Sequence, residues 1–216
     1  MRKYNNAIFD LDGTLLNTKE GIVKSLIDMA ANLEFPPIPE NKYGFFIGPP
    51  IEQSLCEHYC LNDTQTKAAA AVFRKLYTER YLFEAVPYDG IFNMLTMLKE
   101  NGVKLAIATY KRHDYTERII KHFNLDKYCS PCFGSDAESR TTKSAIIKAC
   151  MSEMNIGVSG TVYVGDTEHD RCGAEEAGIG FIGVTYGFGY TQSCHGYAGT
   201  PDEIAGIILG EYINVA

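Results

Sequence analysis

Two patterns of hydrophobic and polar positions alternate along most of the chain. Between the short apolar runs, segments such as 89–102 place Ile91, Met94, Leu95 and Leu98 on one helical face. Alternating strands and helices predict parallel strands joined by right-handed crossovers, hence an open α/β sheet. The apolar runs, rich in β-branched residues and mostly ending in Gly, Thr or Asp, are 6–10, 103–109, 161–166 and 180–187.

The strand pattern stops between about Leu16 and Ala85. This stretch is typical of several helices, interrupted by the proline-containing segments 35–41 and 47–50. We therefore predict an inserted all-helical cap domain. It interrupts a Rossmann-like core with three layers, and its two ends must lie close together. The expected boundaries are a core formed by 1–15 and 86–216 and a cap formed by 16–85.

Composition narrows the expected partners and location. The 216 residues are 45% hydrophobic and carry a net charge of −7, which argues against a nucleic-acid polymer or an anionic membrane as partner. The sequence has no apolar run of about 20 residues and no secretory signal at its start, so we expect a cytoplasmic protein. Its seven cysteines are expected to stay reduced. Cys129 and Cys132 have the spacing of a redox dithiol, but they precede a probable strand, which favours packing and leaves their role open.

Polar side chains follow three of the predicted strands. Asp10 and Asp12, in FDLDGT, come directly after the first strand, while Thr109 and Asp166 end two others. In an open α/β sheet, ligands bind at the carboxyl ends of the strands. We therefore expect these side chains to meet in one crevice. Two carboxylates sharing such a site oppose each other's ionisation, so one of them can carry a proton.

Four motifs in this order resemble the haloacid dehalogenase superfamily of phosphohydrolases, in the branch of phosphoglycolate phosphatases and 5′-nucleotidases. The resemblance covers nearly the whole chain. It implies a Mg²⁺-dependent phosphatase that acts on a small phosphorylated metabolite, with phosphoglycolate and nucleoside 5′-monophosphates as the leading substrates. The motifs are DLDGT at 10–14, IATYK at 107–111, RTTKSAII with Lys143, and VGDTEHD at 164–170.

The resemblance also implies the roles of the carboxylates. Asp10 is expected to be the nucleophile that forms an aspartyl-phosphate. Asp12 is expected to give a proton to the leaving group and then to take one from the attacking water. Mg²⁺ is expected to be held by Asp10, the backbone carbonyl of Asp12, and Asp166. Asp170 is expected to partner Lys143 or a metal-bound water, with an ordinary first-turn helix acid as the alternative.

The other residues of the motifs are expected to bind the phosphoryl group. The Thr109 hydroxyl and the Tyr110 backbone N–H donate to it, and Lys143 neutralises its charge. Lys111 is a candidate for a second anionic group of the substrate. Tyr110 stands where many relatives have a small or amide side chain, so it either narrows the pocket or faces the cap.

Leaving-group selection is expected to reside in the cap, where Arg74, Phe45, Phe46 and Tyr77 are candidates and ordinary cap packing is the alternative. Two other functions use the same aspartates. A sugar phosphomutase would return the phosphoryl group to the sugar, and a non-catalytic phosphoacceptor module would keep it on Asp10. We expect a monomer or a weak homodimer.

Overall fold

The computed structural model describes residues 2–136, 141–190 and 196–211. They divide into two compact units, one formed by 1–16 with 87–216 and the other by 17–86. Short strands β2 (Leu16–Asn17) and β3 (Val86–Pro87) pair where the chain passes between the units. None of the helices in the described ranges has the length and apolar character that a membrane crossing demands.

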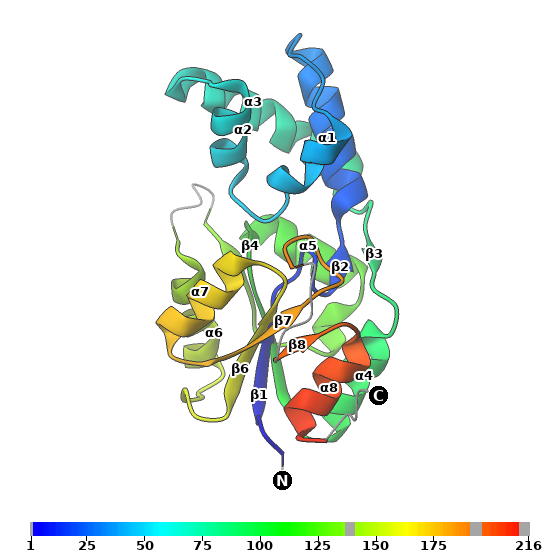
Figure 1. Cartoon of the computed structure of the whole chain (residues 1–216), viewed down its shortest axis with the longest axis vertical. Coiled ribbons are helices and arrows are strands. Elements are labelled where there is room, and N and C mark those ends of the chain that lie inside the picture. Colours follow the sequence, from blue (N-terminus) through cyan, green and yellow to red (C-terminus); the bar gives the residue numbers. More distant parts are fainter. Residues whose placement is uncertain (1, 137–140, 191–195, 212–216) are drawn as a thin grey trace. The chain divides into compact units, whose positions relative to one another are not determined.

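The core unit is built on a six-stranded parallel sheet with the order β5-β4-β1-β6-β7-β8 (Figure 1). The central strand β1 pairs with β4 on one side and β6 on the other, and all four of its residues are buried, as expected for a strand covered on both faces. The strands are β1 (Asn6–Phe9), β4 (Lys104–Arg112), β5 (Cys132–Ser135), β6 (Thr161–Gly165), β7 (Gly180–Val184) and β8 (Tyr197–Ala198).

Helices cover both faces of this sheet, which confirms the predicted Rossmann-like architecture (Figure 1). One face is covered by α6 and α7, whose Ile146, Ile147 and Cys150 pack with Ile8 and Tyr163 of the strands. The other face carries α4, α5 and α8, as the direction of each right-handed crossover requires. The helices are α4 (Ile91–Glu100), α5 (His113–His122), α6 (Lys143–Glu153), α7 (Glu168–Ala177) and α8 (Pro201–Leu209), with the 3-10 turn η3 (Leu125–Lys127).

Two features of the sheet depart from the hydrophobic pattern. Strand β4 continues to Arg112, beyond the expected end at Thr109, after a register shift against β5 between Ala108 and Arg112. The extension is polar and its residues are only half-buried, so the apolar run could not predict it. Strand β8 has two residues, too few for any periodicity to register.

The second unit is helical and has its own core. Helices α1 and α2 pack against α3, with Leu26, Met29, Leu55 and Phe73 buried between them. Asn62 and Gln65 form a capping box at the start of α3, each side chain accepting the backbone N–H of the other residue. The elements are α1 (Lys19–Asn32), η1 (Glu40–Phe46), α2 (Ile51–Tyr59), α3 (Asp63–Leu76) and the π-helical turn η2 (Tyr77–Tyr81).

Candidate active site

Asp10 lies directly after β1, at the carboxyl edge of the sheet. Its backbone N–H donates to the Val164 carbonyl of β6 at 2.8 Å, and its side chain is 5% exposed. Burial raises the pKa of Asp10, and the nearby Asp170 and Asp12 carboxylates add to this, while Lys143 opposes it. The carboxylate is therefore held by the strand itself, in a place where its negative charge needs positive partners.

Lys143 supplies one such partner. It is the first residue of α6 and only 4% exposed, and its Nζ lies 2.8 Å from Asp10 Oδ1 and 2.7 Å from Asp170 Oδ1. Burial alone would lower the pKa of Lys143, but the two carboxylates outweigh burial and the net pKa is raised. The ammonium therefore stays charged. Of the two roles expected for Asp170, the structure favours that of a partner to Lys143.

Asp170 is also part of the start of α7. Its Oδ2 accepts the Thr167 backbone N–H at 2.9 Å and the Thr167 hydroxyl at 2.7 Å, and Thr167 caps the helix in return. The same carboxylate thus serves the helix terminus with one oxygen and Lys143 with the other. The contacts of Asp170 therefore match the expected partnership with Lys143 and also the alternative of a first-turn helix acid.

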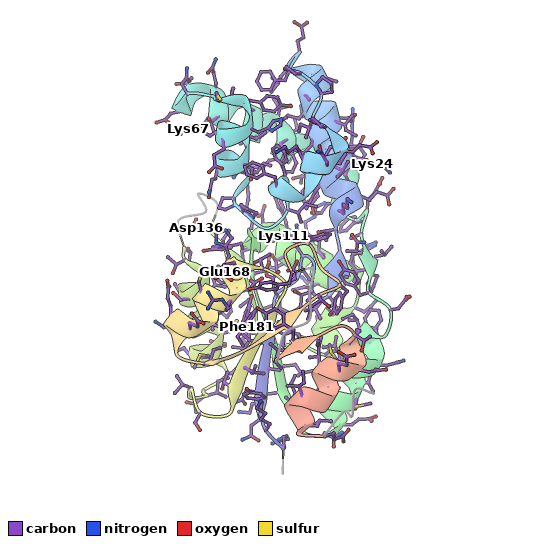
Figure 2. All side chains as sticks on the ribbon, in the orientation of Figure 1. Lys24, Lys67, Lys111, Asp136, Glu168 and Phe181 are labelled. Carbon is purple, nitrogen blue, oxygen red and sulfur yellow. The ribbon has the colours of Figure 1, made fainter. Side chains whose placement is uncertain are left out.

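Asp12 faces a second lysine. Its Oδ2 lies 3.0 Å from Lys111 Nζ, and both side chains are largely buried (Lys111 is labelled in Figure 2). Asp12 Oδ1 is buried and has no hydrogen-bond partner within the described ranges. Lys111, expected to meet an anionic group of the substrate, thus has the second carboxylate of the DLDGT motif as a partner in this structure.

Asp166 follows β6 and is fully buried. The Phe188 backbone N–H donates to its Oδ2 at 2.7 Å, the Thr14 hydroxyl approaches Oδ1 at 3.4 Å, and the Asp166 carbonyl accepts the Tyr190 N–H at 3.1 Å. Burial raises the pKa of Asp166 to about 8, with further increases from Asp10 and Asp170. The segment after β7 therefore wraps around this carboxylate.

Glycines make that close wrapping possible. A Cβ added at Gly13, whose φ is +83°, would lie 2.2 Å from Asp166 Oδ2. A Cβ at Gly187 would lie 2.4 Å from both Asp166 Cβ and the Gly13 carbonyl oxygen. Side chains at either position would force the carboxylate to move.

The arrangement fits a divalent cation. Carboxylate oxygens of Asp10, Asp166 and Asp170 lie within 4.8 Å of one another. With Asp12 included, four carboxylates share the site with two lysine ammoniums, so two negative charges are left uncompensated. Carboxylate oxygens are hard donors of the kind that Mg²⁺ binds.

Thr109 and Tyr110 lie on β4, just past Ile107, the last residue of this strand in register with β1. Thr109 is 1% exposed, and its hydroxyl oxygen accepts the Lys111 N–H at 3.2 Å, so its hydrogen remains available to a ligand. The Tyr110 hydroxyl accepts the backbone N–H of Lys143 at 3.0 Å. Tyr110 therefore contacts the start of α6, which neither of the alternatives for it anticipated.

Two parts of the site were missed from the sequence. The Tyr163 hydroxyl lies 3.1 Å from Lys143 Nζ and 3.5 Å from Asp10 Oδ1, but Tyr163 sits in the apolar run 161–166, where nothing in the pattern marks it as a site residue. The Phe188 N–H is a backbone group that no side-chain pattern reveals. The glycine spacing of 186–189 is the signal that could have pointed to it.

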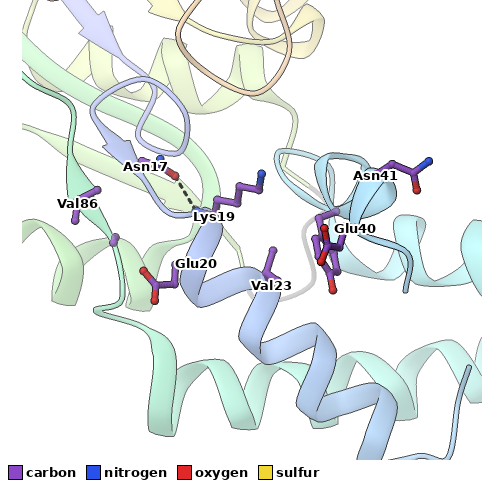
Figure 3. Close-up of a pocket in the computed structure, with 9 residues that line it drawn as sticks. Asn17, Lys19, Glu20, Val23, Glu40, Asn41 and Val86 are labelled. Carbon is purple, nitrogen blue, oxygen red and sulfur yellow. Dashed lines mark hydrogen bonds between the residues drawn. The ribbon is translucent and has the colours of Figure 1, made fainter. Parts of the chain in front are cut away.

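The cap candidates are mostly engaged within their own unit. Arg74 is paired with Glu52. Phe46 and Tyr77 are each 3% exposed and belong to the core of the helical unit, whereas Phe45, the third aromatic candidate, is 41% exposed. A pocket of about 630 Å³ lies within this unit, where the Lys19 N–H donates to Asn17 Oδ1 (Figure 3). Its polar lining consists of Asn17, Lys19, Glu20, Glu40, Asn41 and Tyr43.

The redox spacing at 129–132 is accounted for by packing. Cys129 is 1% exposed, Cys132 is half-buried, and both are free thiols. Burial raises the pKa of Cys132 to about 12 and that of Cys129 well above its ordinary value. A dithiol with so little thiolate is a poor redox centre.

Fold and site together define an α/β protein with a parallel sheet and a buried carboxylate cluster at the carboxyl edge of that sheet. The family model of haloacid dehalogenase-like hydrolases matches residues 7–184, and the chain belongs to this family. It is 32% identical to a 5′-nucleotidase of Pseudomonas aeruginosa over 188 residues, covering 87% of this chain and 85% of that protein.

Two further comparisons agree with this assignment. Phosphoglycolate phosphatase 1 of Pseudomonas aeruginosa is 27% identical over 191 residues, covering 85% of this chain and 70% of that protein. The crystal structure of a predicted phosphatase from Clostridium acetobutylicum has a TM-score of 0.88 at 32% identity, covering 96% of this chain and 99% of that one.

Proposed function

We propose that this hydrolase is a Mg²⁺-dependent phosphatase that cleaves a small phosphomonoester through an aspartyl-phosphate on Asp10. The observation that carries the proposal is the buried cluster of Asp10, Asp12, Asp166 and Asp170 with two lysines, which has an excess of two negative charges when all four carboxylates are ionised. Phosphoryl transfer depends on positioning and on neutralising charge rather than on elaborate covalent chemistry. A site of this composition supplies both.

In the first step, an Asp10 oxygen attacks phosphorus and the bond to the ester oxygen breaks. Asp12 donates its proton to the departing alkoxide. In the second step, water attacks the aspartyl-phosphate, Asp12 takes a proton from it, and the bond between phosphorus and Asp10 breaks to release inorganic phosphate. The Thr109 hydroxyl and the Tyr110 N–H donate to phosphoryl oxygens, and Lys143 neutralises their charge.

Asp10, the Asp12 carbonyl and Asp166 are the groups proposed to hold Mg²⁺. When bound, the ion supplies positive charge to the phosphoryl oxygens and offsets the repulsion among the carboxylates. Asp170 is already occupied by Lys143 and by the start of α7, so we assign it a supporting role rather than a ligand role.

Phosphoglycolate and nucleoside 5′-monophosphates are the proposed substrate classes, because relatives with these activities match most of the chain. We assign leaving-group selection to the helical unit. Reduced cysteines and a metabolite substrate both fit a cytoplasmic location, which stays a prediction.

A phosphate-release screen tests the proposal. Phosphoglycolate, nucleoside 5′-monophosphates and hexose phosphates are each incubated with the protein, with Mg²⁺ and with a chelator. We expect release of phosphate that requires Mg²⁺ and is fastest for one of the first two classes. Isomerised hexose phosphate without free phosphate would instead identify a mutase, and a stable phosphoprotein without turnover would identify a phosphoacceptor module.

Changing Gly187 to Ala is expected to weaken Mg²⁺ binding. The new Cβ would overlap Asp166 and the Gly13 carbonyl, so the carboxylate must shift. Disturbing the groups that orient a metal ligand typically costs about 10- to 100-fold in affinity. Calorimetric titration of the metal-free protein with Mg²⁺ measures the change. Gly157→Ala is the matched control, since its Cβ meets nothing within 4 Å; equal affinities in the two variants would contradict the proposed ligand.

The stabilisation of the protein by Mg²⁺ is expected to grow with pH. In the metal-free protein the pKa of Asp166 is raised from 3.8 to about 8, so the folded state binds more protons than the unfolded state between these values. The free energy of unfolding contributed by this group therefore falls as pH rises through that window. Mg²⁺ binds the deprotonated carboxylate and so restores the free energy of unfolding that is lost as pH rises.

Thermal unfolding with Mg²⁺ and with a chelator, between about pH 6 and pH 8, checks this linkage. The increase in Tm caused by Mg²⁺ is expected to be larger at the higher pH. Asp166→Asn removes the contribution of this group, and the pH dependence left in the variant is that of Asp10, whose pKa burial raises to about 7. A Tm increase that is the same at all pH values would rule out a titrating ligand in this range.

A further inference from the structure

The Lys143 ammonium has a third partner that the proposed mechanism does not use. An ammonium has three N–H donors. Nζ donates to Asp10 Oδ1 at 2.8 Å, forms an ion pair with Asp170 Oδ1 at 2.7 Å, and lies 3.1 Å from the Tyr163 hydroxyl oxygen. Tyr163 is fully buried on β6, within the apolar face covered by α6 and α7. Three buried oxygens, from Asp10, Asp170 and Tyr163, thus surround the ammonium.

The Tyr163 hydroxyl is itself held by the backbone. It donates its hydrogen to the Ala108 carbonyl of β4 at 2.5 Å, which leaves its oxygen free to accept from Lys143. Since β1 lies between β6 and β4 in the sheet, the phenol reaches across the strand that carries Asp10. The Tyr163 hydroxyl thus links Lys143 to Ala108, the residue before Thr109.

Tyr110 holds the other end of the same residue. Its hydroxyl accepts the Lys143 backbone N–H, one of the first-turn donors of α6 that has no partner inside the helix. The centre of its ring lies 5.0 Å from Lys143 Nζ. The lysine stem lies against α7 at Gly173, where a Cβ would come within 2.5 Å of Lys143 Cγ. Lys143 is therefore restrained at its backbone N–H, along its aliphatic side chain and at its ammonium group.

We propose that Tyr110 and Tyr163 are positioning residues that hold Lys143 at its backbone and at its ammonium, so that its charge is fixed beside Asp10 before substrate arrives. The proposal rests on the role of Lys143 in the proposed function. Preorganised charge lowers the barrier because no reorientation is required in the transition state. Tyr110 and Tyr163 then act through Lys143 without contacting the phosphoryl group through their hydroxyls.

The test uses Tyr163→Phe and Tyr110→Phe, each of which removes only a hydroxyl oxygen. A hydrogen bond to a charged group is worth more than one between neutral groups, so we expect kcat to fall about tenfold for Tyr163→Phe and about threefold for Tyr110→Phe. KM is expected to change less than about twofold, because the lysine acts on charge that develops in the transition state. Tyr59→Phe is the control, since the Tyr59 hydroxyl also donates to a backbone carbonyl, that of Pro36.

A second measurement is independent of turnover. The NMR signal of the Lys143 ammonium, assigned by its absence in Lys143→Met, reports hydrogen exchange with water. We expect exchange to be about tenfold faster in Tyr163→Phe and unchanged in Tyr59→Phe. In the Lys143→Met background, adding Tyr163→Phe is expected to lower the residual rate no further, because residues that act through one another are not additive.

The outcomes separate this proposal from the proposed function. Full activity of Lys143→Met would refute the role of Lys143 itself. Loss of activity in Lys143→Met, together with wild-type rates and exchange in both tyrosine variants, would overturn only the positioning proposal. Should Tyr163→Phe fail to fold, Tyr110→Phe decides the question by the same rate and exchange measurements, since Tyr110 is not fully buried and its hydroxyl bonds a helix end.

Discussion

Changing Asp10 to Asn is expected to abolish phosphate release from an aryl phosphate, with a loss of about 10⁴-fold or more, the scale on which removal of a covalent nucleophile acts. The amide is nearly the same size and keeps an oxygen for Lys143, so the fold should survive. It cannot attack phosphorus as a carboxylate does. Steady-state release of phosphate under saturating Mg²⁺ measures the effect, and circular dichroism checks the fold.

Asp202→Asn is the matched control for this variant. Asp202 is exposed in the first turn of α8, so replacing it by Asn makes the same chemical change away from the carboxylate cluster. Its rate is expected to stay within about twofold of the wild type. Retention of activity in Asp10→Asn, at more than a few per cent of the control, would refute the proposed nucleophile.

The chain of motifs was enough to predict the sheet and most of the carboxylates around it. Asp10 and Asp166 come directly after buried apolar strands, and parallel strands bring their carboxyl ends to one edge whatever the details of packing. The local hydrophobic pattern was therefore enough to predict that Asp10 and Asp166 lie at the same edge of the sheet. Lys143, the first residue of α6 after the Thr142 cap, was expected in the site only from the family resemblance.

Pairing between side chains was beyond the reach of the sequence. The sequence did not predict that Lys111 pairs with Asp12 or that the Tyr110 hydroxyl bonds the start of α6, and the roles expected for both residues stay predictions. Each contact depends on the register shift that extends β4 and on side-chain rotamers, which no periodicity encodes. The sequence did not reveal the role of Tyr163 for a related reason, because a tyrosine within an apolar run fits the hydrophobic pattern of a buried strand as any core residue does.

In the cap, two of the four functional candidates are buried, which favours the alternative of ordinary cap packing for them. Phe46 and Tyr77 lie at apolar positions of helical segments, and the same spacing serves a ligand surface or a helix interface. Whether such a residue is buried distinguishes a helix interface from a ligand surface, and burial is known only once the fold is known. The charge balance of the active site was also invisible from the sequence, because it depends on which two of the chain's 20 basic residues reach the carboxylates.

Changing Asp12 to Asn is expected to have an effect that depends on the leaving group. With an alkyl phosphate such as phosphoglycolate, the first step needs a proton from Asp12, so turnover should fall by about 10²- to 10⁴-fold. With a strongly acidic phenol as leaving group no proton is needed, and Asp10 should still be phosphorylated.

The second step in Asp12→Asn then lacks its base. We expect a burst of phenol equal to the amount of enzyme, followed by slow release of phosphate, and a trapped phosphoprotein detectable by mass spectrometry of the intact chain. Lys111 would lose its carboxylate partner in this variant, so Lys111→Met is measured beside it to separate the two effects. Equal losses with alkyl and aryl substrates, without a burst, would show that Asp12 maintains the structure of the site and does not transfer the proton, because only a proton donor distinguishes a poor leaving group from a good one.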